Sequence, residues 1–193
     1  YEEAMATRGS SFTEMVRVFE GIAQVAPKEG SSGQRIAIMH AGGLAPGMNS
    51  AVRAAVRFGM SRGHTMLGIR GSFQGLIDGE VAELNWGDVD DWLAVGGAEL
   101  GTGRSVPSLE QYYAVSRCLE NHDVDALLVI GGHRAYESLN RMLAERDRYP
   151  GFTIPVIALP TSIDNNLPGW EMSIGADTAL NEIVSAVDRL KQS

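Results

Sequence analysis

Apolar runs of strand length alternate with stretches of helical periodicity through most of the chain. The runs that predict β-strands lie at 36–41, 65–69, 126–130 and 154–159. Apolar residues recur at spacings of three and four between these runs and after the last one, which predicts helices there. Such an alternation indicates an α/β domain with a parallel sheet and helices on both of its faces.

Shorter signals place some element boundaries. Residues 108–111 (Ser-Leu-Glu-Gln) have the composition of a capping box, so we expect a helix to begin there. Asp88 is expected to cap a short helix of its own. Gly71, Gly75 and Gly79 recur just after the second predicted strand, and we predict a loop across them.

The first 34 residues have a different organisation from the rest. Residues 11–14 form a capping box, apolar residues follow at helical spacing, and 27–34 have the composition of a flexible linker. We therefore predict a helix with its linker at 1–34 and an α/β domain at 35–193. Two interpretations of the helix stay open, because its apolar stripe could pack on its own domain or dock elsewhere.

Composition narrows the class of protein. The 193 residues are 44% hydrophobic and carry a net charge of −8, which argues against a general nucleic-acid or anionic-membrane partner. The single cysteine, Cys118, excludes a disulfide framework and favours a cytoplasmic location. Because the chain begins at Tyr1 and a predicted helix reaches its last residues, we expect it to be an internal piece of a longer polypeptide.

Unusual loops follow several of the predicted strands. Glycine-rich or polar loops occupy 41–49, 131–134 and 160–166, and another glycine turn ends in Arg104. In parallel α/β sheets, ligands bind beyond the carboxyl ends of the strands. We therefore predict that these loops gather around one anion-sized hollow.

The glycine-rich loops are candidate phosphate-binding turns. Gly43 in the first loop, and Gly131 and Gly132 in the second, let the backbone approach a ligand closely. A helix that begins at such a turn directs free N–H groups and the positive end of its dipole at the ligand. A plain strand-to-helix connection is the alternative, since the first loop matches neither common nucleotide-binding glycine motif.

The loop at 160–166 carries the candidate chemistry. Asp164 is its only carboxylate, and it could accept a proton from a substrate hydroxyl during phosphoryl transfer. An Asx turn, in which the side chain bonds its own backbone, is the alternative that spacing alone favours. Ser162, Asn165 and Asn166 are neutral hydrogen-bonding groups suited to a sugar or a phosphate oxygen.

Several arginines could bind anions. Arg104 follows a glycine turn and could hold a phosphate or steady developing charge, although a solvated surface arginine is equally compatible with its position. Arg53 and Arg57 lie four residues apart on one predicted helix face, so they could share an anion. Arginine pairs at this spacing are more often simply solvated.

The second glycine turn does not suit a metal ion. Mg²⁺ prefers carboxylate and phosphate oxygens, whereas His133 and Arg134 offer neither, and Arg134 would repel the ion. Leu44 removes polarity from the first turn in the same way. The other histidines have no metal-ligand spacing. We therefore expect no metal site in this segment.

These motifs, in this order, resemble those of the 6-phosphofructokinase family. Residues 42–49 resemble its G-G-D-A-P-G-M-N, 100–104 its L-G-[ST]-x-R, 130–134 its I-G-G-D-G and 162–166 its T-I-D-N-D. The resemblance covers about residues 35–193. It implies a phosphofructokinase-type lobe with a Rossmann-like sheet.

Within this family, the chain is similar to the carboxyl-terminal half of the double-length enzymes of fungi and animals. That similarity is carried by 175–181 and 189–193, and residues 1–9 are similar to the connector between the two halves. It implies that the other half transfers phosphate from ATP to fructose 6-phosphate in glycolysis, whereas this half binds fructose 2,6-bisphosphate. The implied partners are sugar phosphates or bisphosphates, the other half of the polypeptide, and a homo- or hetero-oligomer of tetrameric or larger size.

The resemblance also implies roles for single residues. The sugar phosphate would be bound by the following residues: Arg104, Ser162, Ile163, Asp164, Asn165 and Asn166. Arg53 and Arg57 match arginines that bind a nucleotide effector in bacterial enzymes, but Glu80 falls near the place of a third effector arginine. ATP and Mg²⁺ would be cofactors of the parent enzyme, and none is expected to bind this segment alone.

Departures from the family motifs indicate a lobe that has lost catalysis. Leu44 and His133 stand where the family has aspartates, and Asn166 replaces the second aspartate of T-I-D-N-D. Asp164 matches the family's catalytic base, whereas regulatory halves usually carry serine there. Two alternatives therefore remain: a competent half that uses Asp164 with ATP or pyrophosphate, and a lobe that only supports assembly.

Overall fold

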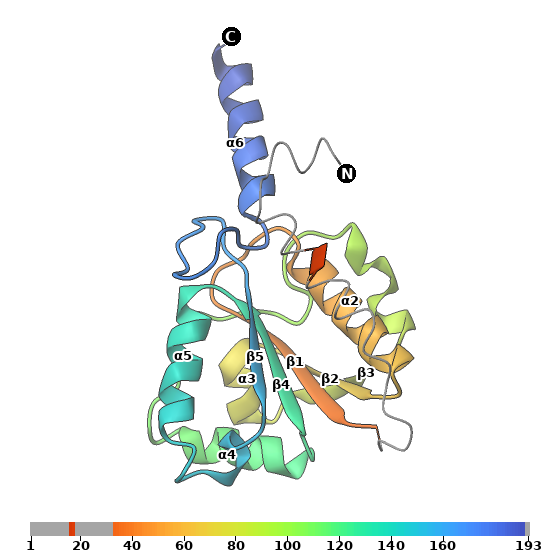
Figure 1. The fold of residues 1–193 in the computed structure, drawn as a ribbon, viewed down its shortest axis with the longest axis vertical. Coiled ribbons are helices and arrows are strands. Elements are labelled where there is room, and N and C mark those ends of the chain that lie inside the picture. The colour runs from red at the N-terminus through yellow and green to blue at the C-terminus, as the bar shows by residue number, and fades with distance from the viewer. Residues whose placement is uncertain (1–15, 18–32, 192–193) are drawn as a thin grey trace. The chain divides into compact units, whose positions relative to one another are not determined.

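The computed structural model describes residues 16–17 and 33–191. The chain divides into two compact units, Tyr1–Ser32 and Gly33–Ser193, and the second contains all of the described strands (Figure 1). The helix predicted near the start of the chain lies outside the described residues apart from Val16 and Arg17, which are helical. The proposed division at residue 34 stays a prediction.

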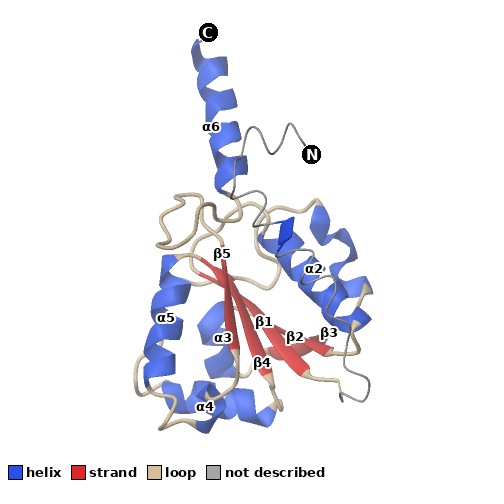
Figure 2. Ribbon diagram, in the orientation of Figure 1, coloured by secondary structure: helices blue, strands red, loops and turns tan. Residues whose placement is uncertain are grey.

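A five-stranded sheet forms the centre of the second unit (Figure 2). Its order is β3-β2-β1-β4-β5, in which β2, β1, β4 and β5 are parallel and β3 is antiparallel to β2. The strands span these residues: β1 Arg35–Ala41, β2 Thr65–Ile69, β3 Val81–Leu84, β4 Ala126–Gly131 and β5 Val156–Pro160. The predicted α/β fold is confirmed, but β3 was missed because its four residues are too short to show a period.

The helices follow the strands as expected, with one addition. They span these residues: α2 Met48–Ser61, α3 Ser72–Asp78, α4 Tyr112–Asn121, α5 His133–Ala144 and α6 Ala176–Lys191, with 3₁₀ segments η1 Gly87–Leu93 and η2 Pro150–Phe152. The loop predicted across Gly71–Gly79 was wrong, because α3 occupies it. Gly71 and Gly79 flank that helix with φ angles of 78° and 77°, so two of the recurring glycines mark helix ends.

Two helix starts differ from the prediction. α4 begins at Tyr112 rather than at Ser108, and a separate turn precedes it, in which the Gln111 side chain accepts the Ser108 N–H at 2.9 Å. Asp88 lies inside η1, and its carboxylate accepts the Asn85 N–H at 2.7 Å. In both places the polar side chain organises the turn without being the first residue of a helix.

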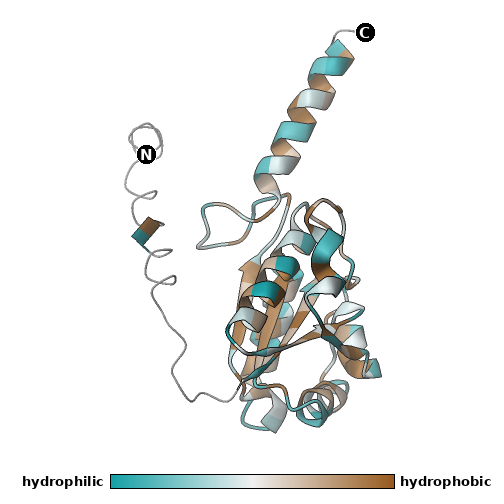
Figure 3. Ribbon diagram, turned by 90° about the vertical axis from the view of Figure 1, so that its right-hand side faces the viewer, coloured by the Kyte–Doolittle hydropathy of each residue, from teal (hydrophilic) through white to brown (hydrophobic). Residues whose placement is uncertain are grey.

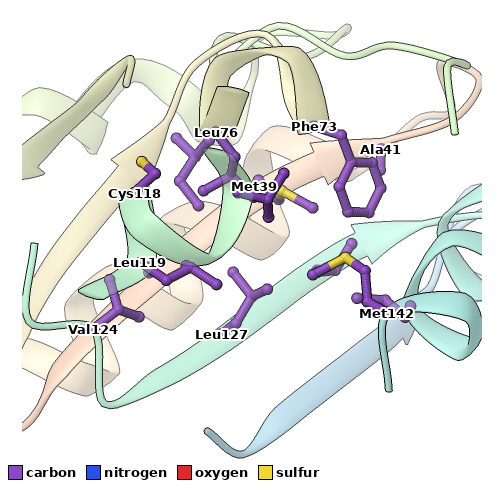
Figure 4. Close-up of a cluster of buried hydrophobic side chains, with 14 of the residues drawn as sticks. Met39, Ala41, Phe73, Leu76, Cys118, Leu119, Val124, Leu127 and Met142 are labelled. Atoms are coloured by element: carbon purple, nitrogen blue, oxygen red, sulfur yellow. The ribbon is translucent and has the colours of Figure 1, made fainter. Parts of the chain in front are cut away.

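Apolar side chains pack on both faces of the sheet. Because side chains alternate along a strand, β1 directs Ile38 toward the side of α2, whereas Ala37 and Met39 face α3 and α4. Figure 4 shows the second of these layers, in which Leu76 lies close to Met39 and Leu119 lies close to Leu127. The prediction of helices on both faces is therefore confirmed.

Helix α6 is different, because it extends beyond the end of the sheet (Figures 1 and 3). Its apolar positions recur at helical spacing as predicted, yet none of its residues is buried. Ile183, Val184 and Val187 are 60%, 52% and 41% exposed. Of the helices that the structure describes, none has the length and hydropathy needed to span a bilayer.

Candidate functional site

Loops from distant parts of the chain surround one hollow of about 470 Å³. It is lined by Gly42, Gly43, Leu44, Arg104, Gly132, His133, Arg134, Thr161, Ser162, Ile163, Asp164 and Asn166. The predicted gathering of the four loops is therefore confirmed. Among the predicted site residues, Gly131, Asn165, Arg53 and Arg57 do not line it.

The hollow lies at the carboxyl ends of β1, β4 and β5. The chain passes from β1 to β2 on one side, and β4 then pairs with β1 on the other side. The order of the strands thus reverses between β1 and β4, which is where open parallel sheets bind their ligands. The loops that follow these two strands form adjacent walls of the hollow.

The first wall joins the turn after β1 to the turn before Arg104. The Gly42 N–H donates to the Gly103 carbonyl at 2.8 Å, and the Thr102 hydroxyl donates to the Gly42 carbonyl at 3.0 Å. A Cβ atom at Gly43 would lie 3.4 Å from a terminal nitrogen of Arg104. The Arg104 guanidinium therefore packs directly against this turn, and a Cβ atom at Gly43 would make ordinary van der Waals contact with it.

The second wall is the junction of β4 with α5. A Cβ atom at Gly131 would overlap the Ala41 carbonyl oxygen, so this glycine brings the ends of β1 and β4 together and does not face the hollow. Gly132 precedes α5 in an extended conformation, and none of the described side chains caps the helix. The first N–H groups of an α-helix lack partners within it. His133 and Arg134 begin α5 and line the hollow.

The third wall is the loop after β5. The Thr161 N–H donates to the Gly131 carbonyl at 3.0 Å, which joins this loop to the second wall. The Ser162 hydroxyl accepts the Asp164 N–H at 3.1 Å. Ser162 therefore forms the local turn that was considered for Asp164, whose carboxylate makes no hydrogen bond to the described part of the chain.

Asn165 has an architectural role in this loop. Its φ angle is 49°, a left-handed conformation that asparagine tolerates better than most residues. Its side chain donates to the Glu171 carbonyl at 3.0 Å and accepts the Ser173 N–H at 2.8 Å. Asn165 thus ties the loop to the segment before α6 and leaves Asn166 to face the hollow.

The charged lining of the hollow is mixed. Within the described residues, Arg104, Arg134 and Asp164 provide it, with His133 beside them. The same part of the chain contains no group of three or more histidine, cysteine, aspartate or glutamate side chains that could hold a metal ion. A lining with two arginines and one carboxylate suits an anion better than a divalent cation.

Arg53 and Arg57 lie elsewhere, between α2 and η1. Arg57 pairs with the Asp90 carboxylate, and its guanidinium lies 4.6 Å from the centre of the Trp86 ring. Arg53 donates to the Asp90 carbonyl at 3.3 Å. Both arginines thus contact Asp90 of this chain, and their predicted role toward a nucleotide effector stays a prediction.

Sequence reasoning missed Thr161 as part of the site. This residue is 1% exposed, and its hydroxyl has no hydrogen-bond partner among the described residues. Its position directly after an apolar strand and before Ser162 was the available signal. His133 and Arg134 were considered only as poor metal ligands, although both line the hollow.

Comparison with known proteins agrees with this geometry. Residues 35–193 match the phosphofructokinase family model. The chain belongs to the phosphofructokinase family. It is 40% identical over 195 residues to the platelet-type ATP-dependent 6-phosphofructokinase of Rattus norvegicus. It is 38% identical over 197 residues to the alpha subunit of the ATP-dependent 6-phosphofructokinase of Candida albicans. All of this chain is covered, but only 25% and 20% of those proteins.

Solved phosphofructokinase structures have the same fold. The T-state enzyme of Pichia pastoris matches all of this chain with a TM-score of 0.84 and 38% identity, over 21% of its own length. The enzyme of Saccharomyces cerevisiae matches 99% of this chain with a TM-score of 0.81 and 35% identity, over 26% of its own length. This phosphofructokinase chain therefore spans about a quarter of the length of the relatives that it matches.

Proposed function

We propose that the chain is part of an ATP-dependent 6-phosphofructokinase, which converts fructose 6-phosphate and ATP to fructose 1,6-bisphosphate and ADP. We further propose that this segment belongs to the regulatory half and that its hollow binds a sugar bisphosphate effector. The lining of the hollow is the observation that supports the proposal. Separate loops contribute arginines and neutral hydrogen-bonding groups to it, and Asp164 is the one carboxylate among the described residues that line it.

Two of the three walls of the hollow do not suit a magnesium nucleotide. A Mg²⁺ ion bound beside phosphates is usually held by one or two carboxylates of the protein. The turns that approach the hollow after β1 and β4 instead present Leu44, His133 and Arg134. We therefore derive no catalytic step through Mg²⁺ in this segment and assign ATP and Mg²⁺ to another part of the enzyme.

Four of the residues that line the hollow can bind a sugar phosphate. The guanidinium of Arg104 can donate two parallel hydrogen bonds to a phosphate. Ser162 and Asn166 can bind sugar hydroxyls, and Ile163 can contact the apolar face of the ring. A ligand held in this way changes the activity of an assembly only if it binds one state better than another.

Calorimetry on the complete natural polypeptide tests this proposal. Arg104→Ala should weaken fructose 2,6-bisphosphate binding about 10- to 100-fold, because a hydrogen bond to a charged group contributes about 1.5–3 kcal/mol. Arg117→Ala is the matched control, since Arg117 pairs with Glu120 and does not line the hollow. Absence of binding would support a lobe that only maintains assembly, whereas equally strong binding in both variants would mean that Arg104 does not hold the ligand.

A catalytic role is the second candidate, and one observation favours it. The Asp164 carboxylate lines the hollow and has no hydrogen-bond partner among the described residues. It could accept the proton of a sugar hydroxyl while that oxygen attacks the terminal phosphorus of ATP or pyrophosphate and ADP or phosphate leaves. In a polypeptide whose other half is inactivated, phosphoryl transfer from ATP or pyrophosphate that Asp164→Asn abolishes would support this role, and no activity would exclude it.

A further inference from the structure

Arg134 lies in the first turn of α5, and the proposed function does not explain its contacts. It is the second residue of α5, it lines the hollow, and its guanidinium pairs with Glu137 at 2.8 Å. Glu137 also pairs with Arg141 at 2.7 Å through its other oxygen. One carboxylate is thus shared by two arginines, and Arg141 does not line the hollow.

Because Glu137 is shared with Arg141, Arg134 can leave this carboxylate at a small cost in free energy. Exposed ion pairs contribute about 0–1 kcal/mol, and the side chains of Arg134 and Arg141 are 60% and 58% exposed. If Arg134 turned toward the hollow, Glu137 would keep its hydrogen bond to Arg141. The carboxylate would therefore not lose all of its cationic partners, and the three side chains together carry one net positive charge.

The surroundings of Arg134 are suited to an anion. The N-terminus of α5 has no side-chain cap among the described residues, so its free N–H groups and its dipole favour a negative charge. A second observation is independent of the helix. Thr161 also lines the hollow, is almost completely buried, and has a hydroxyl without a partner in the described part of the chain. Buried hydroxyl groups normally have a hydrogen-bond partner, and a bound phosphate oxygen would provide one.

Arg134 and Arg104 lie on different walls. Arg104 lies over Gly43 in the wall that follows β1, whereas Arg134 belongs to the wall that follows β4. Two separate cationic positions in a hollow of about 470 Å³ match a small ligand with two anionic groups. A single phosphate would engage one of them.

The geometry points to Arg134 as a phosphate-binding residue, which exchanges Glu137 for the second phosphate of a bisphosphate ligand that binds without a metal ion. This inference rests on the proposed sugar-bisphosphate site and assigns the position of the second phosphate within it. Arg104 then holds the first phosphate, and Arg134, the α5 N-terminus and the Thr161 hydroxyl hold the second. The cation that balances the second phosphate belongs to the protein, so binding does not need Mg²⁺.

Titration calorimetry of the complete natural polypeptide tests the inference with two ligands, fructose 2,6-bisphosphate and fructose 6-phosphate, each with and without EDTA. Arg134→Ala should weaken the bisphosphate at least about tenfold and change the monophosphate less than about twofold. Arg117→Ala is the matched control, because Arg117 pairs with Glu120 on another helix, takes no part in the exchange at Glu137 and does not line the hollow. It should leave both affinities within about twofold, and melting temperatures check that each variant is folded.

The outcomes separate this inference from the proposed function. If Arg104→Ala weakens the bisphosphate but Arg134→Ala has no effect, the hollow binds sugar phosphate and the role of Arg134 is wrong. Equal losses for both ligands in Arg134→Ala would mean that Arg134 does not bind the second phosphate, and loss of binding in EDTA would mean that a metal ion is required. A wild-type protein that binds neither ligand would overturn both proposals.

Discussion

Replacing Gly131 with alanine tests the contact on which the hollow is built. Gly131 ends β4, where it pairs with Ala41 of β1 and with Pro160 of β5. An added Cβ atom would overlap the Ala41 carbonyl oxygen and would lie 2.8 Å from the Ala135 Cβ and 3.0 Å from the Ala41 carbonyl carbon. The Ala41 carbonyl oxygen would be the closest of these atoms, and non-bonded heavy atoms in contact normally lie about 3.5 Å apart, so the backbone of β1 or β4 must move by more than about 1 Å.

The size of the effect follows from that overlap. Overpacking a closely packed site typically costs about 1–3 kcal/mol, and the obstacle at Gly131 is backbone that cannot rotate away. We expect a loss near the upper end, about 3 kcal/mol. For a domain of 150–250 residues this corresponds to a fall in melting temperature of about 6–12 °C.

The assay is thermal unfolding of the complete natural polypeptide, combined with hydrogen exchange of the β1 and β4 amides. Gly87→Ala is the control, because a Cβ atom there would meet nothing within 4 Å. Hydrogen exchange should accelerate at the carboxyl ends of β1 and β4 in Gly131→Ala alone. A Gly131→Ala protein with the melting temperature of the control would refute the close approach of these strand ends.

Three further predictions concern residues outside the lining of the hollow. Asn165→Ala should destabilise the loop at 160–173 by about 1–3 kcal/mol, because the Ser173 N–H and the Glu171 carbonyl lose their partner; faster hydrogen exchange at Ser173 checks this. Asp90→Ala should remove the carboxylate partner of Arg57, while the Trp86 ring still covers the guanidinium. Titration with inorganic pyrophosphate should then detect a binding event that the wild-type protein lacks. If no such event is seen, the Arg57–Asp90 pair only holds η1 on α2. His40 is buried, which lowers its pKa from 6.5 despite the opposing bond to the Met48 carbonyl. Since the unfolded chain takes up a proton at pH values where the folded chain does not, stability should fall as the pH drops below about 6.5, and the melting temperature of His40→Gln should depend less on pH in that range.

Much of the fold could be predicted because its signals are local. The strand runs and the helical spacing that follow them depend on residues close together in the sequence, and β1, β4 and β5 lie where the apolar runs predicted them. Helix α3 was missed because its flanking glycines gave a local signal that was ambiguous. Glycine at both ends of a seven-residue helix has the same spacing as glycine in a loop, and the structure distinguishes the two by the φ angles of Gly71 and Gly79.

The partners of individual side chains could not be predicted, because they come from distant segments. Asp90 is 33 residues from Arg57, and nothing in its neighbourhood marks it as the partner of an arginine. Asn165 occupies a motif position that the family resemblance assigns to the ligand, yet its side chain is bonded to Glu171 and Ser173. A motif indicates that a loop has a particular conformation, but only tertiary contacts determine which of its side chains face the ligand.

The same distinction explains why the position of the hollow was more predictable than its chemistry. Parallel strands place their carboxyl ends at one edge of the sheet, so loops that follow β1, β4 and β5 must meet there whatever residues they contain. The chemistry instead depends on single exchanges within those loops. A carboxylate at position 133 or 134 would add an oxygen ligand beside Asp164, whereas His133 and Arg134 add positive or neutral groups at the N-terminus of α5. In the proposed sugar-bisphosphate site, the fold thus supplies the geometry, and two adjacent side chains determine whether a metal ion or the protein itself balances the negative charge of the ligand.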